Sequence, residues 1–441
     1  MSTKVIRDPL YNYIGIDRKR DGWLIDLLDC RELQRLRRIH QLGVSNFTYP
    51  GADHNRLVHS LGVLHLTLQA LQHLKNASDD EQVNQARAPL LATALVHDVG
   101  HGPFSHLFEP CLGIDHEEWS KKIILSEDCE VNKVLSKVAK PLPQTVAELI
   151  DSNNNDHPTW MKYLISSQLD MDRLDYLRRD SLFTGAGYGH FDWHRILSTF
   201  ELHEQNSGRD IVWSDKAKFA IEEFIFARYY MYQNVYLHKT TRGFEKMIEA
   251  MWRRARKLYN DGEKVSLVPA VRRFWSGDSD VRDYLQIEEF TVLQQIQNWT
   301  ENNHASLSDL AKRFLARKRF VAIDPPPVKN QLIPSYKKWE GALKRLVEKN
   351  GFTPGTDYCL RDELKAKYNQ PYFPETEADE QSAKNAIRVK VDGESKPVEI
   401  STILDRLKPI TKKPVGRVRY YVPKEVELAA RKLAKDWKEP K

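Results

Sequence analysis

The sequence predicts a mainly α-helical fold with a smaller α+β domain toward the C-terminus. Apolar residues recur at helical spacing in several segments before residue 320. After Ile323, the run Asp324-Pro325-Pro326-Pro327 cannot continue a helix and is typical of a stiff connector. Short segments of alternating apolar residues follow it. We therefore expect a helical domain over residues 1–325 and a basic α+β domain over residues 326–441.

The most regular helical pattern has a leucine every three or four residues from Leu57 to Leu71. Helices are expected over residues 29–39, 55–74, 89–99, 168–180 and 216–251. We expect Asp29 to cap the first of these helices and Pro89 to open the third. The polar residues 76–88 are expected to form an exposed loop.

The C-terminal region combines one helical pattern with several strand patterns. Residues 336–349 have helical periodicity. Strands are expected over residues 387–391, 398–400 and 417–422, and the first two are separated by the turn Asp392-Gly393. These elements predict the small α+β domain.

Composition excludes several classes of protein. The chain has 441 residues, of which 41% are hydrophobic and 10% aromatic, which excludes general disorder. No stretch of about 18 apolar residues is present, so we expect no membrane span. The first ten residues lack an apolar signal segment, and we expect a cytoplasmic protein. Cys30, Cys111, Cys129 and Cys359 share no CxxC spacing, which indicates reduced thiols rather than a zinc framework.

The net charge of +6 is concentrated at one end of the chain. Residues 401–441 contain 12 Lys and Arg against 5 Asp and Glu. The cations include Lys412, Lys413, Arg417, Arg419, Arg431 and Lys432. Such a basic tail is typical of a nucleic-acid contact, and equally of a solvated surface.

Histidines gather in the first third of the chain. Nine of the 15 histidines lie between His40 and His116. The pair His97-Asp98 directly follows an apolar segment that is expected to be buried. Burying such a pair costs several kcal/mol unless the two side chains are paired or bind a metal. Clustered histidines are typical of metal sites and of acid–base relays.

Two other segments supply partners for this pair. Arg56 and His59 are three residues apart, so they share one face of a helix. Asp172, on the expected helix 168–180, is a further acidic ligand. A site built from His59, His97, Asp98 and Asp172 has two nitrogen and two oxygen ligands. Such a set suits Mn, Fe, Ni, Zn or, less well, Mg.

Five segments together resemble the HD-domain deoxynucleoside triphosphate triphosphohydrolases, or dNTPases. They are Lys4–Pro9, Leu36–Gly43, Tyr49–Arg56, His59–Val63 and His97–His106. The resemblance spans residues 1–325 and is most specific up to residue 180, with no SAM domain before the catalytic region. It implies a helical HD core that carries the catalytic site.

The resemblance also implies a reaction. In this family a metal held by His59, His97, Asp98 and Asp172 activates water for attack on the α-phosphorus, which releases deoxynucleoside and intact triphosphate. Residues after the His97-Asp98 pair are implied to act in proton transfer and phosphate contact. They are His101, which contacts the α-phosphate, His106, the general acid for the 5′-oxygen, and their supporting partners Glu109 and His116.

Substrate and regulatory residues are implied by the same resemblance. Those of the substrate site are Gln41, Leu42, Arg56, Arg173, Tyr176, Asp180, Arg228, Tyr232 and Tyr236. The ring of Tyr236 is implied to exclude a 2′-hydroxyl. A guanine-nucleotide site between subunits is implied for Lys4, Val5, Asp29, Gln34 and Arg37, which corresponds to a tetramer activated by nucleotide, with Mg accompanying the nucleotide.

Two alternatives to a dNTPase stay open at this point. The chain could be another HD phosphohydrolase that acts as a nucleotidase, phosphodiesterase or nuclease. It could also be a non-catalytic protein that binds nucleotide or nucleic acid. The complete set of four ligands argues against the non-catalytic reading, because a binding module does not need them together.

Overall fold

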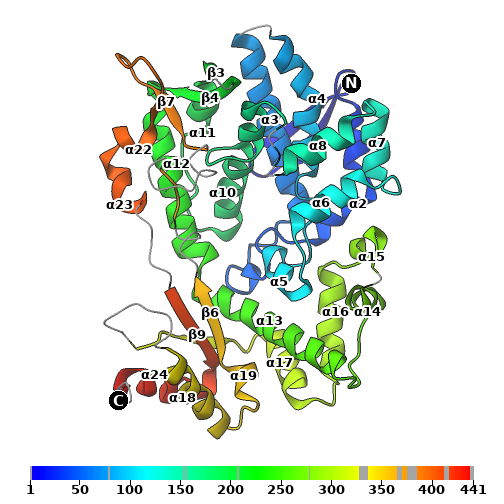
Figure 1. The fold of residues 1–441 in the computed structure, drawn as a ribbon, viewed down its shortest axis with the longest axis vertical. Coiled ribbons are helices and arrows are strands. Elements are labelled where there is room, and N and C mark those ends of the chain that lie inside the picture. The colour runs from blue at the N-terminus through cyan, green and yellow to red at the C-terminus, as the bar shows by residue number, and fades with distance from the viewer. Residues whose placement is uncertain are drawn as a thin grey trace.

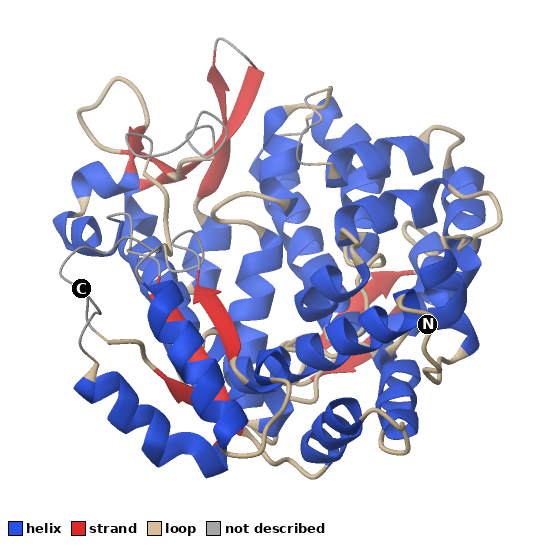
Figure 2. Cartoon of the chain, turned by 60° about the horizontal axis from the view of Figure 1, so that its bottom comes forward, coloured by secondary structure: helices blue, strands red, loops and turns tan. Residues whose placement is uncertain are grey.

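The computed structural model describes residues 2–77, 80–151, 154, 156–205, 208–277, 279–326, 336–364, 370–374, 385–411 and 417–437. Helices make up most of it, and the strands gather in three small sheets (Figures 1 and 2). The predicted mainly α-helical class is therefore confirmed. Within the described ranges, none of the helices is both long enough and apolar enough to span a bilayer.

The chain opens with a β-hairpin that the sequence analysis did not predict. The first elements are β1 (Thr3–Asp8), β2 (Asn12–Asp17), α1 (Trp23–Leu28), α2 (Arg31–Arg35) and the 3-10 helices η1 (Leu36–Arg38) and η2 (Ser45–Phe47). The helix predicted over 29–39 is present from Arg31 to Arg38 as α2 and η1, but Asp29, its predicted N-cap, is wrong. Asp29 ends α1, and Cys30 interrupts the helical path with φ −59° and ψ 139° before α2 begins.

Helix α3 (Arg56–Ala77) packs against two other helices, and these three form the centre of the helical body in the upper part of Figure 1. The other two are α4 (Glu81–Val96) and α10 (Met171–Thr184). The helices predicted over 55–74 and 168–180 are confirmed. The loop predicted over 76–88 is wrong, because the Asp80 carboxylate accepts a hydrogen bond from the Gln82 amide at 2.8 Å and starts α4 there. Pro89 lies inside α4.

Other helices surround this centre. They are η3 (Ser105–Leu107), α5 (Phe108–Leu112), α6 (His116–Leu125), α7 (Glu130–Val138), α8 (Leu142–Ile150), α9 (Thr159–Ile165), α11 (Trp193–Ser198), η4 (Asp215–Ala217), α12 (Lys218–Met231), α13 (Lys239–Asn260), α14 (Pro269–Ser276), α15 (Val281–Leu285), α16 (Glu289–Trp299) and α17 (Ala305–Leu315). The single helix predicted over 216–251 is divided. A π-helix, η5 (Tyr232–Tyr236), follows α12, and Leu237 leaves the helical path before α13.

The sheets join segments that are far apart in the sequence. The remaining strands are β3 (Phe200–Gln205), β4 (Gly208–Ser214), β5 (Phe320–Ile323), β6 (Leu360–Leu364), β7 (Arg388–Lys390), β8 (Val398–Glu399) and β9 (Arg417–Pro423). The sheet orders are β3-β4-β7-β8 and β5-β9-β6. The strands predicted near 387–391, 398–400 and 417–422 are confirmed. Because β4 pairs with β7 and β5 with β9, strand pairing crosses the predicted division at residue 325, which stays a prediction.

The C-terminal region also contains helices. They are α18 (Tyr336–Lys349), α19 (Gly355–Tyr358), α22 (Ile400–Ile403), η7 (Asp405–Leu407), α23 (Lys408–Thr411), η8 (Lys424–Val426) and α24 (Glu427–Asp436). The predicted helix 336–349 is confirmed as α18. Pro327, at the end of the predicted connector, lies outside the described residues.

Several cations of the basic tail have acidic partners. Arg417 lies 3.0 Å from Asp324, and Arg431 lies 2.9 Å from Glu427. Lys412 and Lys413 lie outside the described residues. A nucleic-acid contact by this tail stays a prediction.

Arg35 on α2 supports the loop that follows α4. Its guanidinium is buried and donates hydrogen bonds to the carbonyl oxygens of His101 at 2.8 Å and Ile287 at 2.7 Å. The Tyr284 ring lies 5.2 Å from the same guanidinium, and the Tyr284 hydroxyl donates to the Gly100 carbonyl at 2.5 Å. Two residues from distant helices thus hold the backbone at 100 and 101.

The substitution Arg35→Met is expected to lower the free energy of unfolding by about 2–4 kcal/mol, because it leaves two buried carbonyl oxygens without donors. Urea unfolding followed by circular dichroism measures this change. The control is Arg20→Met, at an exposed position. Equal stability of the two variants would contradict the support assigned to Arg35.

Candidate metal centre

Three segments bring the four predicted metal ligands to one place. His59 lies on α3, one turn after Arg56. His97 ends α4, with its amide bonded to the Thr93 carbonyl at 2.9 Å, and Asp98 follows directly. Asp172 lies in the first turn of α10, which the Asp170 carboxylate caps. Because α3 packs against both α4 and α10, the four side chains meet.

The distances between the ligand atoms are short. His59 Nε2 lies 2.9 Å from Asp172 Oδ1 and 3.8 Å from Asp98 Oδ2. His97 Nε2 lies 3.4 Å from Asp98 Oδ1 and 3.9 Å from Asp172 Oδ1. One ligand atom from each of His59, His97 and Asp98 lies within 4.8 Å of the other two. This spacing is that of side chains able to share one ion.

The chemistry of the donors fits a divalent cation. His97 Nε2 is buried and has no hydrogen-bond partner among the described residues. The other ring nitrogen, His97 Nδ1, lies 3.0 Å from the Ala94 carbonyl oxygen, so Nδ1 is the protonated nitrogen and Nε2 presents its lone pair to the site. Two imidazoles and two carboxylates form a ligand set that borderline divalent cations accept.

Asp175, which was not among the predicted site residues, fixes the orientation of His59. Its Oδ2 lies 2.8 Å from His59 Nδ1, which leaves His59 Nε2 facing Asp172. Burial alone lowers the pKa of His59, but hydrogen bonds to Asp172 and Asp175 outweigh it and raise the pKa to about 10. The same negative field that holds a proton on His59 attracts a cation.

Asp175 is itself held by donors from distant segments. Arg179 donates to both of its oxygens, at 2.8 and 2.9 Å, and the Tyr11 hydroxyl donates at 2.8 Å. Arg179 also donates to Asp8 at 2.9 Å. The site for this carboxylate requires Gly62, because a Cβ there would lie 1.8 Å from Asp175 Oδ1. Asp8 lies in the segment Lys4–Pro9 that carries the resemblance, but no sequence signal assigned Asp8 or Tyr11 to this site, since the hairpin that carries them was not predicted.

Arg56 forms a hydrogen bond with Asp98, one of the predicted metal ligands. Its Nη1 donates to Asp98 Oδ2 at 2.5 Å, and its Nε donates to Ser105 Oγ at 2.9 Å. Burial opposes ionisation of Asp98, but Arg56, His97 and His101 together lower its pKa well below the ordinary value. Asp98 is therefore a carboxylate anion, the form that binds a cation.

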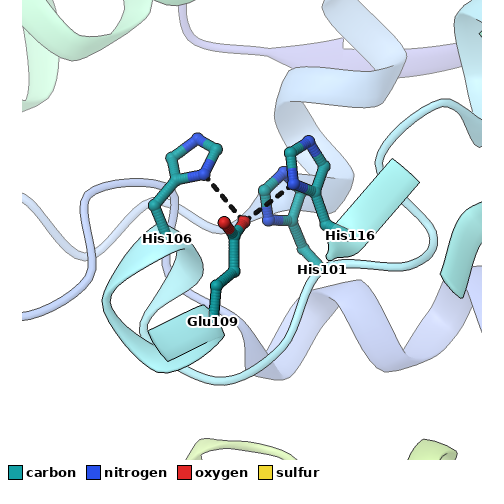
Figure 3. Close-up of side chains that lie close together, drawn as sticks. All are labelled: His101, His106, Glu109 and His116. Carbon is teal, nitrogen blue, oxygen red and sulfur yellow. Dashed lines mark hydrogen bonds and ion pairs between the residues drawn. The ribbon is translucent and has the colours of Figure 1, made fainter. Parts of the chain in front are cut away.

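The four predicted proton-transfer residues form one cluster beside the ligands (Figure 3). Glu109 Oε1 lies 2.9 Å from His106 Nδ1 and 2.7 Å from His116 Nδ1. The His101 and His116 rings stack with centroids 4.0 Å apart. His101 Nε2 lies 3.3 Å from Asp98 Oδ1, which joins this cluster to the ligand set.

The loop between His101 and His106 has an unusual backbone. Phe104 and Ser105 adopt φ values of +55° and +58°, a conformation that residues other than glycine rarely adopt. Ser105 Oγ donates to the His40 carbonyl at 2.7 Å and thereby holds the turn. The turn leaves His106 exposed and His101 buried, with their rings 4.9 Å apart.

The predicted substrate residues form a second side of the site. Tyr176 and Asp180 lie on α10, and Tyr232 and Tyr236 lie on η5. The Tyr236 hydroxyl donates to Asp180 at 2.8 Å. The ring of Tyr176 has its centroid 6.4 Å from that of His59 and 6.3 Å from that of Tyr236. Aromatic rings therefore extend from the ligands to η5.

Two arginines and the Gln41 segment complete this side. Arg173 pairs with Asp170, and Arg228 lies 5.7 Å from the Tyr232 ring. Gln41 follows the bridge between His40 and Asn55 and has a buried Oε1 without a partner among the described residues. Leu42 packs, partly buried, on the core.

A C-terminal segment that the sequence analysis did not connect with the site reaches this side. Arg228 Nη1 donates to the Pro371 carbonyl at 2.8 Å. Gln168 accepts from the Phe373 amide at 2.7 Å and donates to the Phe373 carbonyl at 2.9 Å. Residues 370–374 therefore form hydrogen bonds both with Arg228, which is predicted to bind phosphate, and with the turn that precedes α10.

The five predicted regulatory residues lie in two groups. Arg37 Nε donates to Gln34 Oε1 at 2.7 Å, and Asp29 is exposed nearby at the end of α1. Lys4 and Val5 lie on β1, and Val5 is 54% exposed. Within the described part of the chain, no hydrogen bond or ion pair joins the two groups. A nucleotide site between subunits stays a prediction.

Sequence comparisons place the ligands in a known domain. The HD-domain family model matches residues 56–180. The chain is 40% identical over 327 residues to the uncharacterized protein YwfO of Bacillus subtilis. This alignment covers 74% of this chain and 72% of YwfO. The chain is 28% identical over 266 residues to the deoxynucleoside triphosphate triphosphohydrolase SAMHD1 homolog of Dictyostelium discoideum, which covers 56% of this chain and 48% of that protein. The chain thus spans about half of that relative.

Solved structures share the fold over nearly the whole chain. A phosphohydrolase from Bacteroides thetaiotaomicron matches with a TM-score of 0.77 and 26% identity, covering 96% of this chain and 99% of that one. A hypothetical protein from Aquifex aeolicus shares the fold, with a TM-score of 0.69 and 24% identity. The chain therefore belongs to the HD-domain phosphohydrolase family, whose members include the SAMHD1 deoxynucleoside triphosphate triphosphohydrolases.

Proposed function

We propose that this chain is a divalent-metal-dependent dNTP triphosphohydrolase, which converts a dNTP and water into a deoxynucleoside and triphosphate. The observation that carries the proposal is that the side chains of His59, His97, Asp98 and Asp172 lie within a few ångströms of one another. Arginine and tyrosine side chains line the adjacent face of the site. The deoxynucleoside triphosphate triphosphohydrolase activity of the SAMHD1 relatives supports the choice of substrate.

The arginines of the site bind the phosphates in this proposal. A divalent cation held by the four ligands supplies Lewis-acid charge and a water molecule of lowered pKa. Arg56, Arg173 and Arg228 present guanidinium groups whose planar N–H donors match phosphate oxygens. The Nε atoms of Arg173 and Arg228 are buried and have no hydrogen-bond partner among the described residues, so these donors are free to bind a ligand.

Proton transfer belongs to the histidine cluster. His101 contacts the α-phosphate, and His106 donates a proton to the 5′-oxygen as the bond from the α-phosphorus to that oxygen breaks. Glu109 accepts hydrogen bonds from both His106 and His116, so it fixes the orientation of the donor ring. Exposure of His106 allows its proton to be replaced from solvent.

The sugar lies against the side formed by α10 and η5. Asp180 accepts a hydrogen bond from the 3′-hydroxyl, and the Tyr236 ring packs against C2′ and excludes a 2′-hydroxyl. Gln41 and Leu42 line the opposite side of the sugar, Tyr176 contacts the phosphates, and Tyr232 faces the base. The hydrogen bond from Tyr236 to Asp180 supports these assignments, because it shows that the ring lies beside the carboxylate assigned to the 3′-hydroxyl.

Incubation of the purified protein with each dNTP and Mn²⁺ or Mg²⁺ is expected to yield deoxynucleoside and triphosphate. Separate His97→Ala and Asp98→Ala variants are expected to lose bound metal and to lower turnover more than about 100-fold, because each removes a ligand. Ion-exchange chromatography of the products and metal analysis by mass spectrometry measure both effects.

The control for these variants is His157→Ala, since His157 pairs with Glu148 away from the site. Release of pyrophosphate and nucleoside monophosphate would contradict attack on the α-phosphorus. Full activity in His97→Ala or Asp98→Ala would contradict the proposal that these residues hold the catalytic metal.

The substitution Tyr236→Ala is expected to reduce the preference for dNTP over NTP by about 10- to 100-fold, because it removes the ring that excludes the 2′-hydroxyl. Tyr236→Phe keeps the ring and loses only the hydrogen bond to Asp180, so it is expected to keep that preference. The ratio of kcat/KM for dATP and ATP measures the effect. An unchanged ratio in Tyr236→Ala would assign the selection to another residue.

The pairing of Glu109 with His116 is expected to make stability depend on pH. Burial opposes the shift, but hydrogen bonds from His106 and His116 lower the pKa of Glu109 to about 2 from 4.5, so its contribution is present above 4.5 and lost toward 2. Burial likewise opposes the shift of His116, but Glu109 raises its pKa above 6.5, so its contribution is present below 6.5 and lost at higher pH.

The Glu109→Gln substitution is therefore expected to destabilise the protein more at pH 6 than at pH 9, by about 1–2 kcal/mol. Urea unfolding at the two pH values measures the difference. A loss that is equal at both pH values would show that the charges of this pair do not interact in the folded protein.

A further inference from the structure

The thiol of Cys30 and the carboxylates of Glu32 and Glu130 lie close together, and none of the three residues belongs to the HD ligand set. Cys30 precedes α2, Glu32 lies in its first turn, and Glu130 opens α7. One ligand atom from each of these three side chains lies within 4.8 Å of the other two. Cys30 is 3% exposed and Glu32 is fully buried. Helices α2 and α7 pack on each other, so the meeting is part of the fold.

Glu32 has an unsatisfied oxygen at this place. Its Oε1 accepts hydrogen bonds from Arg31 Nε at 3.0 Å and from the Glu130 amide at 3.2 Å. Its Oε2 is buried and has no hydrogen-bond partner among the described residues. A buried carboxylate oxygen is normally bonded to a donor or to a cation. The Oε2 atom is therefore available to bind a cation.

Negative charge also accumulates around the thiol. Burial, followed by Glu32, Glu130, Asp26 and Asp29, raises the pKa of Cys30 to about 12. Arg31 pairs with Glu32, but its side chain is 55% exposed and therefore screened by water. A divalent cation would neutralise this field and favour loss of the thiol proton.

We propose that Cys30, Glu32 and Glu130 bind a divalent cation of the Zn²⁺ type, at a site separate from the HD ligands. A thiolate favours borderline-soft cations, and carboxylates complete such sites with bonds of about 2.0–2.3 Å. Binding releases the Cys30 proton to solvent and involves no redox step.

The cation would have a structural role that reaches the HD centre. It would fasten the start of α2 to the start of α7. The same α2 carries Arg35, whose guanidinium holds the His101 carbonyl at 2.8 Å. The absence of CxxC spacing excludes a zinc framework built from cysteines only, whereas this site needs one thiol and two carboxylates that the fold brings together.

Titration of the metal-depleted protein with Co²⁺ tests the proposal. A cobalt–thiolate bond gives a charge-transfer absorption band that the HD ligands, which are nitrogen and oxygen atoms, cannot give. The wild-type protein is expected to show this band, and Cys30→Ser is expected to lose it. His97→Ala is expected to keep the band, as is the matched control Cys359→Ser at another buried thiol.

Glu130 is the exposed ligand of this site, so its substitution leaves the buried core unchanged. Glu130→Gln is expected to weaken Co²⁺ binding at the thiolate site at least tenfold, with an unchanged circular dichroism spectrum. Absence of the band in the wild-type protein, its persistence in Cys30→Ser, or unchanged affinity in Glu130→Gln would each overturn the proposal. These readouts do not use dNTP hydrolysis, so failure of the proposed function would leave the result unaffected.

Discussion

The buried carboxylate of Asp175 is the constraint on which the rest of the site depends. It accepts from Tyr11 in the loop between β1 and β2 and from Arg179 on its own helix, and it bonds His59 on α3. A buried carboxylate without these partners would cost several kcal/mol. Satisfying it fixes the distance between α3 and α10, and with it the separation of His59 from Asp172. Gly62 is the residue that permits this close approach.

The C-terminal region completes the site from the other side. Residues 370–374 reach Gln168, four positions before Asp172, and the guanidinium of Arg228. The pairing of β4 with β7 and of β5 with β9 holds the same region against the helical body. Residues 370–374 are therefore part of the environment of Arg228, which is proposed to bind phosphate.

The sequence was most informative where periodicity or a short motif determines the local structure. The leucine pattern located α3, and the close approach of His59, His97, Asp98 and Asp172 follows from helices that the sequence already indicated.

Prediction from the sequence failed where tertiary contacts determine the local structure. Asp80 caps α4, which begins at Glu81, eight residues before Pro89. The π-helix at 232–236 interrupts the helix that was predicted to run from 216 to 251. Asp175 could not be assigned a role, because two of its neighbours, Tyr11 and Asp8, lie in a hairpin without a clear alternating pattern. The regulatory roles of Lys4 and Val5 on β1, and of Asp29, Gln34 and Arg37 between the end of α1 and η1, stay predictions, since they need a second subunit.

A crystal structure of the protein soaked with Mn²⁺, with anomalous scattering used to locate the metal, tests the central claim most directly. The account predicts an anomalous peak at coordination distance from His59 Nε2, His97 Nε2, Asp98 and Asp172. A peak coordinated only by the cluster of His101, His106, Glu109 and His116, with His97 Nε2 left unbound, would contradict it.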